Sequence, residues 1–261
     1  MSDPNSSPSR NPTGPSDPKR RQAAGLPGSD VSEIRFRVRA RTFDTRLTRD
    51  VSGRYLVYQP PDYDPARRWP LLLFLHGAGE RGDELERVAI HGPLRFIRET
   101  GTDLPFVIVA PQVPEDRVWS VQFLDAVLDE VLREHAIDED RIYVTGISMG
   151  GFGTWQLALE YPHRFAAIVP ICGGGTFPGA CGLRHLPIWA FHGARDTVVP
   201  VSHTEEFVER LRECSGRIRY TRYEDAGHDA WTRTYADPAL YTWLLRHRRG
   251  HPGAVDDLHA T

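Results

Sequence analysis

The stretch Val144-Thr145-Gly146-Ile147-Ser148-Met149-Gly150-Gly151 decides the fold of this chain. Before it, Arg141–Thr145 is β-branched and aromatic, as in a buried strand, and after it Thr154–Leu159 has the composition of a helix. The glycines around Ser148 let a strand turn into a helix within a few residues, so the serine hydroxyl is predicted to project from a strained apex. A Gly-x-Ser-x-Gly sequence also occurs in ordinary glycine-rich turns, but its position between a strand and a helix favours a nucleophile.

The composition is that of one globular domain with tails. The chain has 261 residues, 40% of them hydrophobic, and a formal net charge of -3. This length suits a single α/β domain, which we place at residues 31–250. Residues 1–30 are rich in proline and serine, so we expect a disordered tail there, and residues 251–261 form a polar tail. The balanced charge gives no reason to expect nucleic acid as a partner, and the oligomeric state stays open.

Two features of the sequence concern the compartment. The basic trio Lys19-Arg20-Arg21 is not followed by the apolar stretch of an export signal, and no run reaches the roughly 18 apolar residues of a membrane helix. We therefore expect a cytoplasmic protein without membrane insertion. Cys172, Cys181 and Cys214 lack metal-ligand spacing, so no metal and no cofactor is expected. Cys172 and Cys181 flank a glycine-rich loop, and whether they pair is left open.

The order of apolar runs predicts an α/β fold. Ile34–Ala40 alternates apolar and charged residues and is predicted to pair with Gly53–Tyr58 as antiparallel strands. Short apolar runs typical of buried parallel strands then alternate with segments of helical spacing. The predicted strands are Leu71–Leu75, Phe106–Ala110, Ile142–Thr145, Ala166–Ile171, Ile188–Phe191 and Ile218–Tyr223, and the predicted helices are Val121–His135, Gly153–Tyr161, His203–Cys214 and Pro238–Arg246. This pattern predicts a doubly wound, mostly parallel sheet of about eight strands with helices on both faces.

Partners for the serine are expected where the parallel strands end. Serine is a weak nucleophile that needs a base, and the base needs a carboxylate to orient it. Asp196 directly follows Ile188–Phe191, although aspartate at such a position also serves turns and helix caps. Among the 11 histidines, His228 is favoured as the base because it lies in a glycine-containing loop after the last predicted strand. His192, inside the Asp196 loop, is interpreted as a packing or turn residue.

The loop after Leu71–Leu75 supplies candidate N–H donors for an oxyanion. It reads His76-Gly77-Ala78-Gly79-Glu80-Arg81-Gly82, and its glycines let the backbone turn back toward the serine. The N–H groups of Ala78 and Gly79, together with that of Met149 at the start of a helix, are the candidate donors. A phosphate-binding loop is the alternative, but the lysine and the following hydroxyl residue of such a loop are missing.

Together these segments resemble the α/β-hydrolase superfamily. The order Ser148, Asp196, His228 is the order found there, and the similar segments are Leu75–Gly82, Ala110–Gln112, Gly146–Gly151, His192–Asp196 and Gly227-His228. Within the superfamily, the chain is similar to phospholipase/carboxylesterase-like and predicted-peptidase esterases, which are related to polyhydroxybutyrate depolymerases and feruloyl esterases. The resemblance covers about residues 53–246. It implies hydrolysis of small-molecule carboxylic esters, with small or aromatic acyl groups, through an acyl-enzyme on a Ser-His-Asp triad.

The substrate pocket and the exact function are less determined by the sequence. Trp119 and Trp231 are tentative substrate contacts, since aromatic side chains in loops near the site stack on aromatic or sugar groups; packing under a loop is the alternative. A serine peptidase or amidase on the same triad is a second possible function. A non-catalytic hydrolase fold used as a binding module is a third, and the presence of all three triad candidates argues against it.

Overall fold

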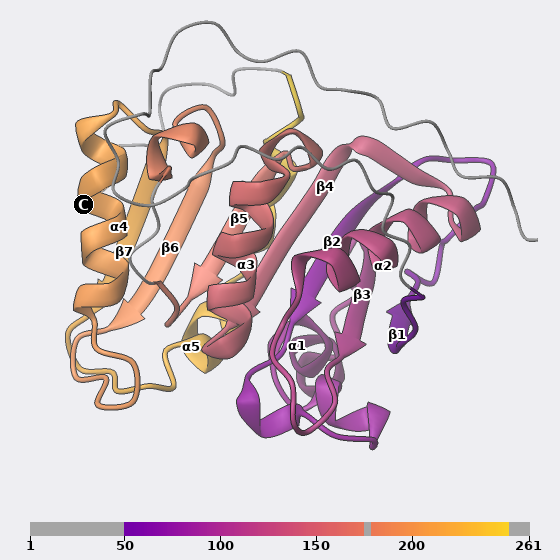
Figure 1. Cartoon of the computed structure of the whole chain (residues 1–261). Helices are drawn as coiled ribbons and strands as arrows, with labels where there is room; N and C mark the ends of the chain where they lie inside the picture. Colours follow the sequence, from indigo (N-terminus) through magenta and orange to yellow (C-terminus); the bar gives the residue numbers. More distant parts are fainter. Residues whose placement is uncertain (1–49, 175–178, 251–261) are drawn as a thin grey trace, which may run out of the picture. The chain divides into compact units, whose positions relative to one another are not determined.

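The computed structural model describes residues 50–174 and 179–250, and these form one sheet of seven strands in the order β1-β3-β2-β4-β5-β6-β7 (Figure 1). β1 runs antiparallel to β3, and all other neighbouring strands are parallel. The strands are β1 (Arg54–Tyr58), β2 (Trp69–Leu75), β3 (Val107–Gln112), β4 (Ile137–Ile147), β5 (Ala167–Ile171), β6 (Ile188–Gly193) and β7 (Ile218–Tyr223). The predicted doubly wound, mostly parallel sheet is confirmed, with seven strands in the described part of the chain instead of about eight.

Helices cover both faces of the sheet. Their bounds in the described residues are α1 (Gly92–Thr100), α2 (Val121–Glu134), α3 (Met149–Glu160), α4 (Ser202–Glu213), α5 (Trp231–Ala236) and α6 (Pro238–Leu245). α2, α3 and α4 contribute to one hydrophobic core, and α1, α5 and α6 contribute to the other. Figure 1 shows α2, α3 and α4 on the near face of the sheet, with the arrowheads of β2, β3 and β6 all pointing to its lower edge.

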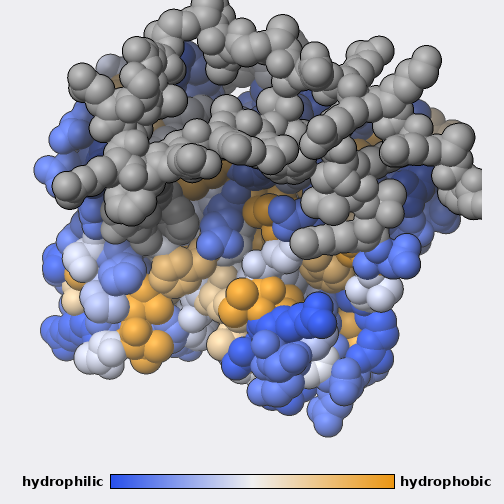
Figure 2. Space-filling view, in the orientation of Figure 1, coloured by the Kyte–Doolittle hydropathy of each residue, from blue (hydrophilic) through white to orange (hydrophobic). Residues whose placement is uncertain are grey.

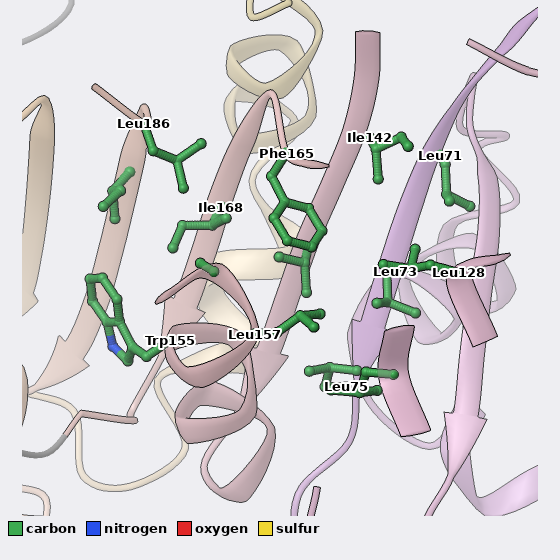
Figure 3. Packing of buried hydrophobic residues seen from close by; sticks show 14 of the residues in the cluster. Leu71, Leu73, Leu75, Leu128, Ile142, Trp155, Leu157, Phe165, Ile168 and Leu186 are labelled. Carbon is green, nitrogen blue, oxygen red and sulfur yellow. The ribbon is translucent and has the colours of Figure 1, made fainter. Parts of the chain in front are cut away.

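Alternate side chains of β2 pack in the two cores. Leu71, Leu73 and Leu75 belong to the core beneath α2, α3 and α4, whereas Leu72 and Phe74 belong to the core on the opposite face. A strand that is covered on both sides must be apolar at every position, and all seven residues of β2 are buried. Figure 3 shows the first core, in which leucines of β2 and α3 lie between the sheet and the helices.

Three elements differ from the predictions: β1 has another partner, and α1 and the short α5 were not predicted. Gly53–Tyr58 was predicted to pair with Ile34–Ala40, which lies outside the described residues, as do the predicted tails; β1 pairs with β3. α1, which begins with Gly92-Pro93, was not among the predicted helices. Proline is compatible with the first helical turn, and Gly101, with φ 66°, ends the helix in the left-handed conformation.

The cysteine pairing left open by the sequence is resolved. Cys181 forms a disulfide with Cys214, and Cys172 is a free, buried thiol. The bond joins the short 3₁₀-helix η4 (Ala180–Leu183) to the residue after α4, with 5.5 Å between the two Cα atoms. The disulfide therefore links the connection between β5 and β6 to the C-terminal end of α4.

Candidate active site

Ser148 lies at the turn between β4 and α3, where its backbone has φ 52° and ψ -115°. The turn brings two backbone segments very close together. A Cβ atom on Gly150 would lie 2.0 Å from the carbonyl oxygen of Leu75, and one on Gly146 would lie 2.3 Å from the carbonyl oxygen of Gly150. Only glycine fits at these two positions. The structure therefore contains the sharp strand-to-helix turn, with the serine at its apex, that the sequence predicted.

The ring of His228 lies between Ser148 and Asp196. Its Nε2 atom is 2.9 Å from Oγ of Ser148, and its Nδ1 atom is 2.6 Å from Oδ2 of Asp196. The three residues follow β4, β6 and β7, so their side chains meet at the edge of the sheet where the parallel strands end. The structure thus brings both Ser148 and Asp196, the two other residues selected from the sequence, within hydrogen-bond distance of His228.

Close backbone contacts hold the loop after β6 against the loop after β7. A Cβ atom on Gly193, the last residue of β6, would lie 2.0 Å from the carbonyl oxygen of Gly227, so the end of β6 touches the loop after β7 directly. The N–H group of Arg195 donates to the carbonyl oxygen of Ala226 at 2.9 Å. The distance between the carboxylate and the imidazole is therefore set by the main chain as well as by the side chains.

The carboxylate of Asp196 is fully buried and surrounded by donors. Its Oδ1 atom accepts from the N–H groups of Val198 and Val199 at 2.8 and 2.9 Å, and its Oδ2 atom faces His228 and Nε2 of His192 at 2.6 and 3.1 Å. Burial alone would raise the pKa of Asp196, but the hydrogen bonds from His228 and the two N–H groups outweigh burial and hold the pKa below its usual value. The group is a charged carboxylate that fixes the orientation of the imidazole ring.

The loop after β2 lies beside the turn that bears the serine. A Cβ atom on Gly77 would lie 3.7 Å from the carbonyl oxygen of Ile147, so the residue before Ala78 contacts the residue before Ser148. Ala78 begins the 3₁₀-helix η1 (Ala78–Glu80), and Met149 begins α3. The first N–H groups of a helix have no acceptor within it. Two candidate oxyanion donors are thus first residues of helices, and the third, Gly79, is exposed in η1.

The ring of His76 holds this loop through hydrogen bonds. Its Nε2 atom accepts from the N–H group of Val113 at 3.1 Å, and its Nδ1 atom lies 2.6 Å from the carbonyl oxygen of Gly77. Burial above all, with a smaller effect of the guanidinium groups of Arg81 and Arg87, lowers the pKa of His76 to about 4 against the raising effect of the Gly77 carbonyl. The ring is therefore neutral, with its hydrogen on Nδ1, and joins the ends of β2 and β3.

The two tryptophans have different surroundings. Trp119 is only 5% exposed, its ring packs 4.7 Å from the ring of His76, and its Nε1 atom donates to the His76 carbonyl oxygen at 3.1 Å. This position matches the alternative of packing under a loop. Trp231 is partly exposed, begins α5 and meets the ring of His228 edge to face at 5.0 Å. Trp231 therefore borders the site, whereas Trp119 supports it.

The comparison with known families identifies the chain. A family model described as Phospholipase/Carboxylesterase matches residues 110–242, about half of the sequence. The chain belongs to the phospholipase/carboxylesterase family. The matched part includes all three of Ser148, Asp196 and His228. The resemblance inferred from the motifs is thus confirmed.

Individual relatives of this carboxylesterase-family chain include curated enzymes and a solved structure. It is 28% identical over 195 residues to the bifunctional acetylxylan esterase/xylanase XynS20E of Neocallimastix patriciarum, covering 72% of this chain but 27% of that protein. It is 26% identical to a probable feruloyl esterase C of Aspergillus niger, covering 78% of each. A crystal structure of a thermostable esterase matches with 35% identity and a TM-score of 0.65, over 75% of this chain and 59% of that one.

One cluster in the carboxylesterase-family chain has metal-ligand atoms close together. The ligand atoms of Cys172, His192 and Asp196 lie within 4.8 Å of one another. Burial raises the pKa of the Cys172 thiol to about 12, so it is protonated, and both oxygens of Asp196 already accept hydrogen bonds. These residues do not fit a metal ion, and the cluster is part of the hydrogen-bonded site.

The sequence did not single out several residues that hold the loop of η1. Oε2 of Glu80, which is 8% exposed, accepts from the N–H group of Gly77 at 2.9 Å. Arg81 donates to the carbonyl oxygen of Ala78 at 3.0 Å, and Arg87 donates to that of Gly79 at 2.6 Å. Charged side chains thus hold successive peptide groups of the candidate oxyanion loop. A glutamate and an arginine directly after a glycine-rich turn were the only sequence signal for this arrangement.

Proposed function

We propose that this member of the phospholipase/carboxylesterase family is a serine esterase that works through an acyl-enzyme. The observation that carries the proposal is the pair of hydrogen-bond distances that link Ser148 to His228 and His228 to Asp196. His228 takes the proton of the serine hydroxyl as Oγ attacks the ester carbonyl, and it returns the proton to the leaving alcohol. Water, activated by the same base, then hydrolyses the acyl-enzyme and releases the carboxylic acid.

The oxyanion of each tetrahedral intermediate is held by backbone N–H groups. We assign this role to Met149 and Ala78, with Gly79 as a further donor, because Met149 begins α3 and Ala78 begins η1 beside the serine. The positive end of a helix dipole at Met149 adds to the stabilisation of the negative charge. Removal of one such donor costs roughly 3–4 kcal/mol of transition-state stabilisation in comparable enzymes.

The substrates proposed are esters with small or aromatic acyl groups. Acetylxylan and feruloyl esterases among the relatives support this choice, as does the partly exposed ring of Trp231 against His228. In the described residues, three of the exposed large hydrophobic side chains, Ile90, Val118 and Val198, lie in the connections that follow β2, β3 and β6. Figure 2 shows separate apolar patches on the lower part of the molecule, the side where these strands end.

The disulfide bears on the cellular compartment in which the protein works. The structure contains no helix, among those described, that is long and apolar enough to cross a bilayer. The cytoplasmic location expected from the sequence stays a prediction, and the disulfide between Cys181 and Cys214 argues against it, because such bonds persist mainly in oxidising compartments.

The test is a hydrolysis screen of p-nitrophenyl esters of increasing acyl length, with methyl ferulate and a proline-containing peptide amide alongside. The wild type is compared with Ser148→Ala, which removes the nucleophile and leaves the turn glycines in place. Ester cleavage that is lost in the variant by several orders of magnitude supports the proposal. Cleavage of the amide alone would point to a peptidase, and near-normal ester cleavage by the variant would refute the assignment of Ser148.

A further inference from the structure

A second histidine contacts the carboxylate of the triad. His192 lies near the end of β6, and its side chain is completely buried. Its Nε2 atom is 3.1 Å from Oδ2 of Asp196 and 2.9 Å from the carbonyl oxygen of Val199, while its Nδ1 atom is 2.8 Å from Oγ1 of Thr204. Oδ2 of Asp196 is thus shared by two histidine rings, His192 and His228.

The neighbours of the His192 ring determine where its hydrogen lies. Nε2 faces a carbonyl oxygen and a carboxylate oxygen, both of which only accept, so Nε2 must carry a hydrogen. Nδ1 faces the hydroxyl of Thr204, which also contacts the carbonyl oxygen of Gly173, so in the neutral ring Nδ1 shares the single hydroxyl hydrogen with that carbonyl. Burial keeps the pKa of His192 below its usual value against the effects of Val199 and Asp196, in agreement with a neutral ring. The Nε2 hydrogen therefore lies between the carbonyl oxygen of Val199 and Oδ2 of Asp196, and His192 donates toward both.

We propose that His192 is a positioning residue that acts through Asp196 on the base of the active site. Its N–H group, shared with the carbonyl oxygen of Val199, faces Oδ2, whereas the backbone donors bind Oδ1, and it takes up part of the negative charge on Oδ2. Less of that charge then faces His228, so His192 limits how strongly the carboxylate favours the protonated imidazole. The inference rests on the proposed triad and adds a fourth member to its hydrogen-bond network.

The other ionisable groups around His192 do not supply this donor. The Cys172 thiol, on the segment after β5, has a ligand atom within 4.8 Å of those of His192 and Asp196, but it donates to the carbonyl oxygen of His228 at 3.2 Å. His228, from the loop after β7, approaches Asp196 through its own Nδ1 atom. His192 is therefore the neighbour whose removal changes the number of donors on Oδ2 without altering the ring of His228.

The first measurement needs no variant. Nitrogen NMR spectra of the wild-type imidazole rings report which nitrogen of His192 carries hydrogen. We expect a neutral ring with hydrogen on Nε2 throughout the pH range in which the enzyme is active. A ring with hydrogen on Nδ1 alone would overturn the proposal, since it has no hydrogen to donate to Asp196. This result is independent of activity, so it is distinguishable from a failure of the esterase assignment, which Ser148→Ala tests.

The second measurement is the pH profile of kcat/KM for His192→Phe and His192→Gln. Phenylalanine keeps a ring and removes the donor, so the acid limb is expected to move to higher pH by ~0.5 unit, with a roughly tenfold lower plateau. Glutamine carries an amide N–H in reach of Asp196, so it is expected to restore the wild-type limb. Thr204→Val is the matched control, because it removes the partner of Nδ1 and leaves the Nε2 donor; its limb should stay in place. An equal shift in all three variants, or none in His192→Phe, would contradict the proposal.

Discussion

Nε2 of His228 lies 2.9 Å from Oγ of Ser148, although the two residues are 80 positions apart in the sequence. Parallel strands explain this proximity, because β4 and β7 both end at the same edge of the sheet as β6. The contact that defines the site is therefore a product of the sheet order.

The carboxylate of Asp196 is expected to set the tautomer of the base. Asp196→Asn replaces an acceptor of the His228 Nδ1 hydrogen by an amide of the same shape, which favours the wrong tautomer. We expect kcat on p-nitrophenyl acetate to fall by about 10⁴-fold, with the fold intact by circular dichroism. A fall of less than tenfold would show that the base does not depend on this carboxylate.

Glu80 is expected to control the geometry of the oxyanion loop. Glu80→Ala removes the acceptor of the Gly77 N–H group and frees the loop that carries Ala78, so kcat should fall about 10–100-fold with little change in KM. Glu80→Gln keeps an acceptor oxygen and should retain more activity. Steady-state kinetics of the two Glu80 variants test this role. Equal kcat values for Glu80→Ala and the wild type would exclude it.

The close approach at Gly150 predicts a strong effect of one methyl group. In Gly150→Ala the new Cβ would collide with the backbone of Leu75, so the free energy of unfolding should decrease by about 3 kcal/mol. Gly182→Ala is the control, since a Cβ there meets no atom within 4 Å, and its change should stay within about 1 kcal/mol. Urea unfolding of both variants measures the difference; similar values would mean that the turn relaxes freely.

The disulfide predicts a dependence of stability on reduction. The crosslinked residues are 33 positions apart, so in the chain-entropy account Cys181→Ser should lower the free energy of unfolding by about 4 kcal/mol. Thiol titration of the oxidised protein in denaturant should find Cys172 alone, and reduction should raise the count to all 3 cysteines. Three free thiols in protein isolated without reductant would instead agree with a cytoplasmic protein.

The neutral state of His76 predicts a loss of stability in mild acid. Burial first of all lowers the pKa of His76 to about 4 from a usual 6.5, so below pH 6.5 the unfolded chain binds a proton that the folded chain does not. Stability therefore falls as the pH decreases from about 6.5 to about 4, by roughly 3 kcal/mol from this group. Urea unfolding across that range should show a shallower pH dependence for His76→Gln. His163→Gln, at an exposed position, should keep the wild-type slope; equal slopes for all three proteins would contradict the prediction.

The sequence was sufficient for features that depend on local pattern. The turn at Ser148 needs a strand, a helix and two glycines, all of which are contiguous, and the positions of Asp196 and His228 after apolar runs followed from the strand order. The sheet was predictable for the same reason, since strands such as β2 are apolar at every position.

Features that depend on contacts between distant segments were not predictable. His192 and Glu80 are ordinary residues in the sequence, and only the folded loops bring them to Asp196 and Gly77. Trp119 could be assigned to packing only once the neighbouring helix was placed, because a Cβ on Gly153 would lie 2.9 Å from its ring. The pairing of Cys181 with Cys214 equally depends on where α4 ends.

The position of β7 at one edge of the sheet has a consequence for the protein during its synthesis. In the proposed mechanism Ser148 is the nucleophile and His228 its base; the segment with Ser148 leaves the ribosome first, and His228 follows 80 residues later, after β7. At the roughly 5–20 residues per second of translation, the base is made about 4–16 s after the nucleophile. A nascent chain that carries Ser148 without His228 has no activated hydroxyl. The proposed mechanism therefore allows a chain to attack esters only after β7 and the loop that follows it have been made and have docked.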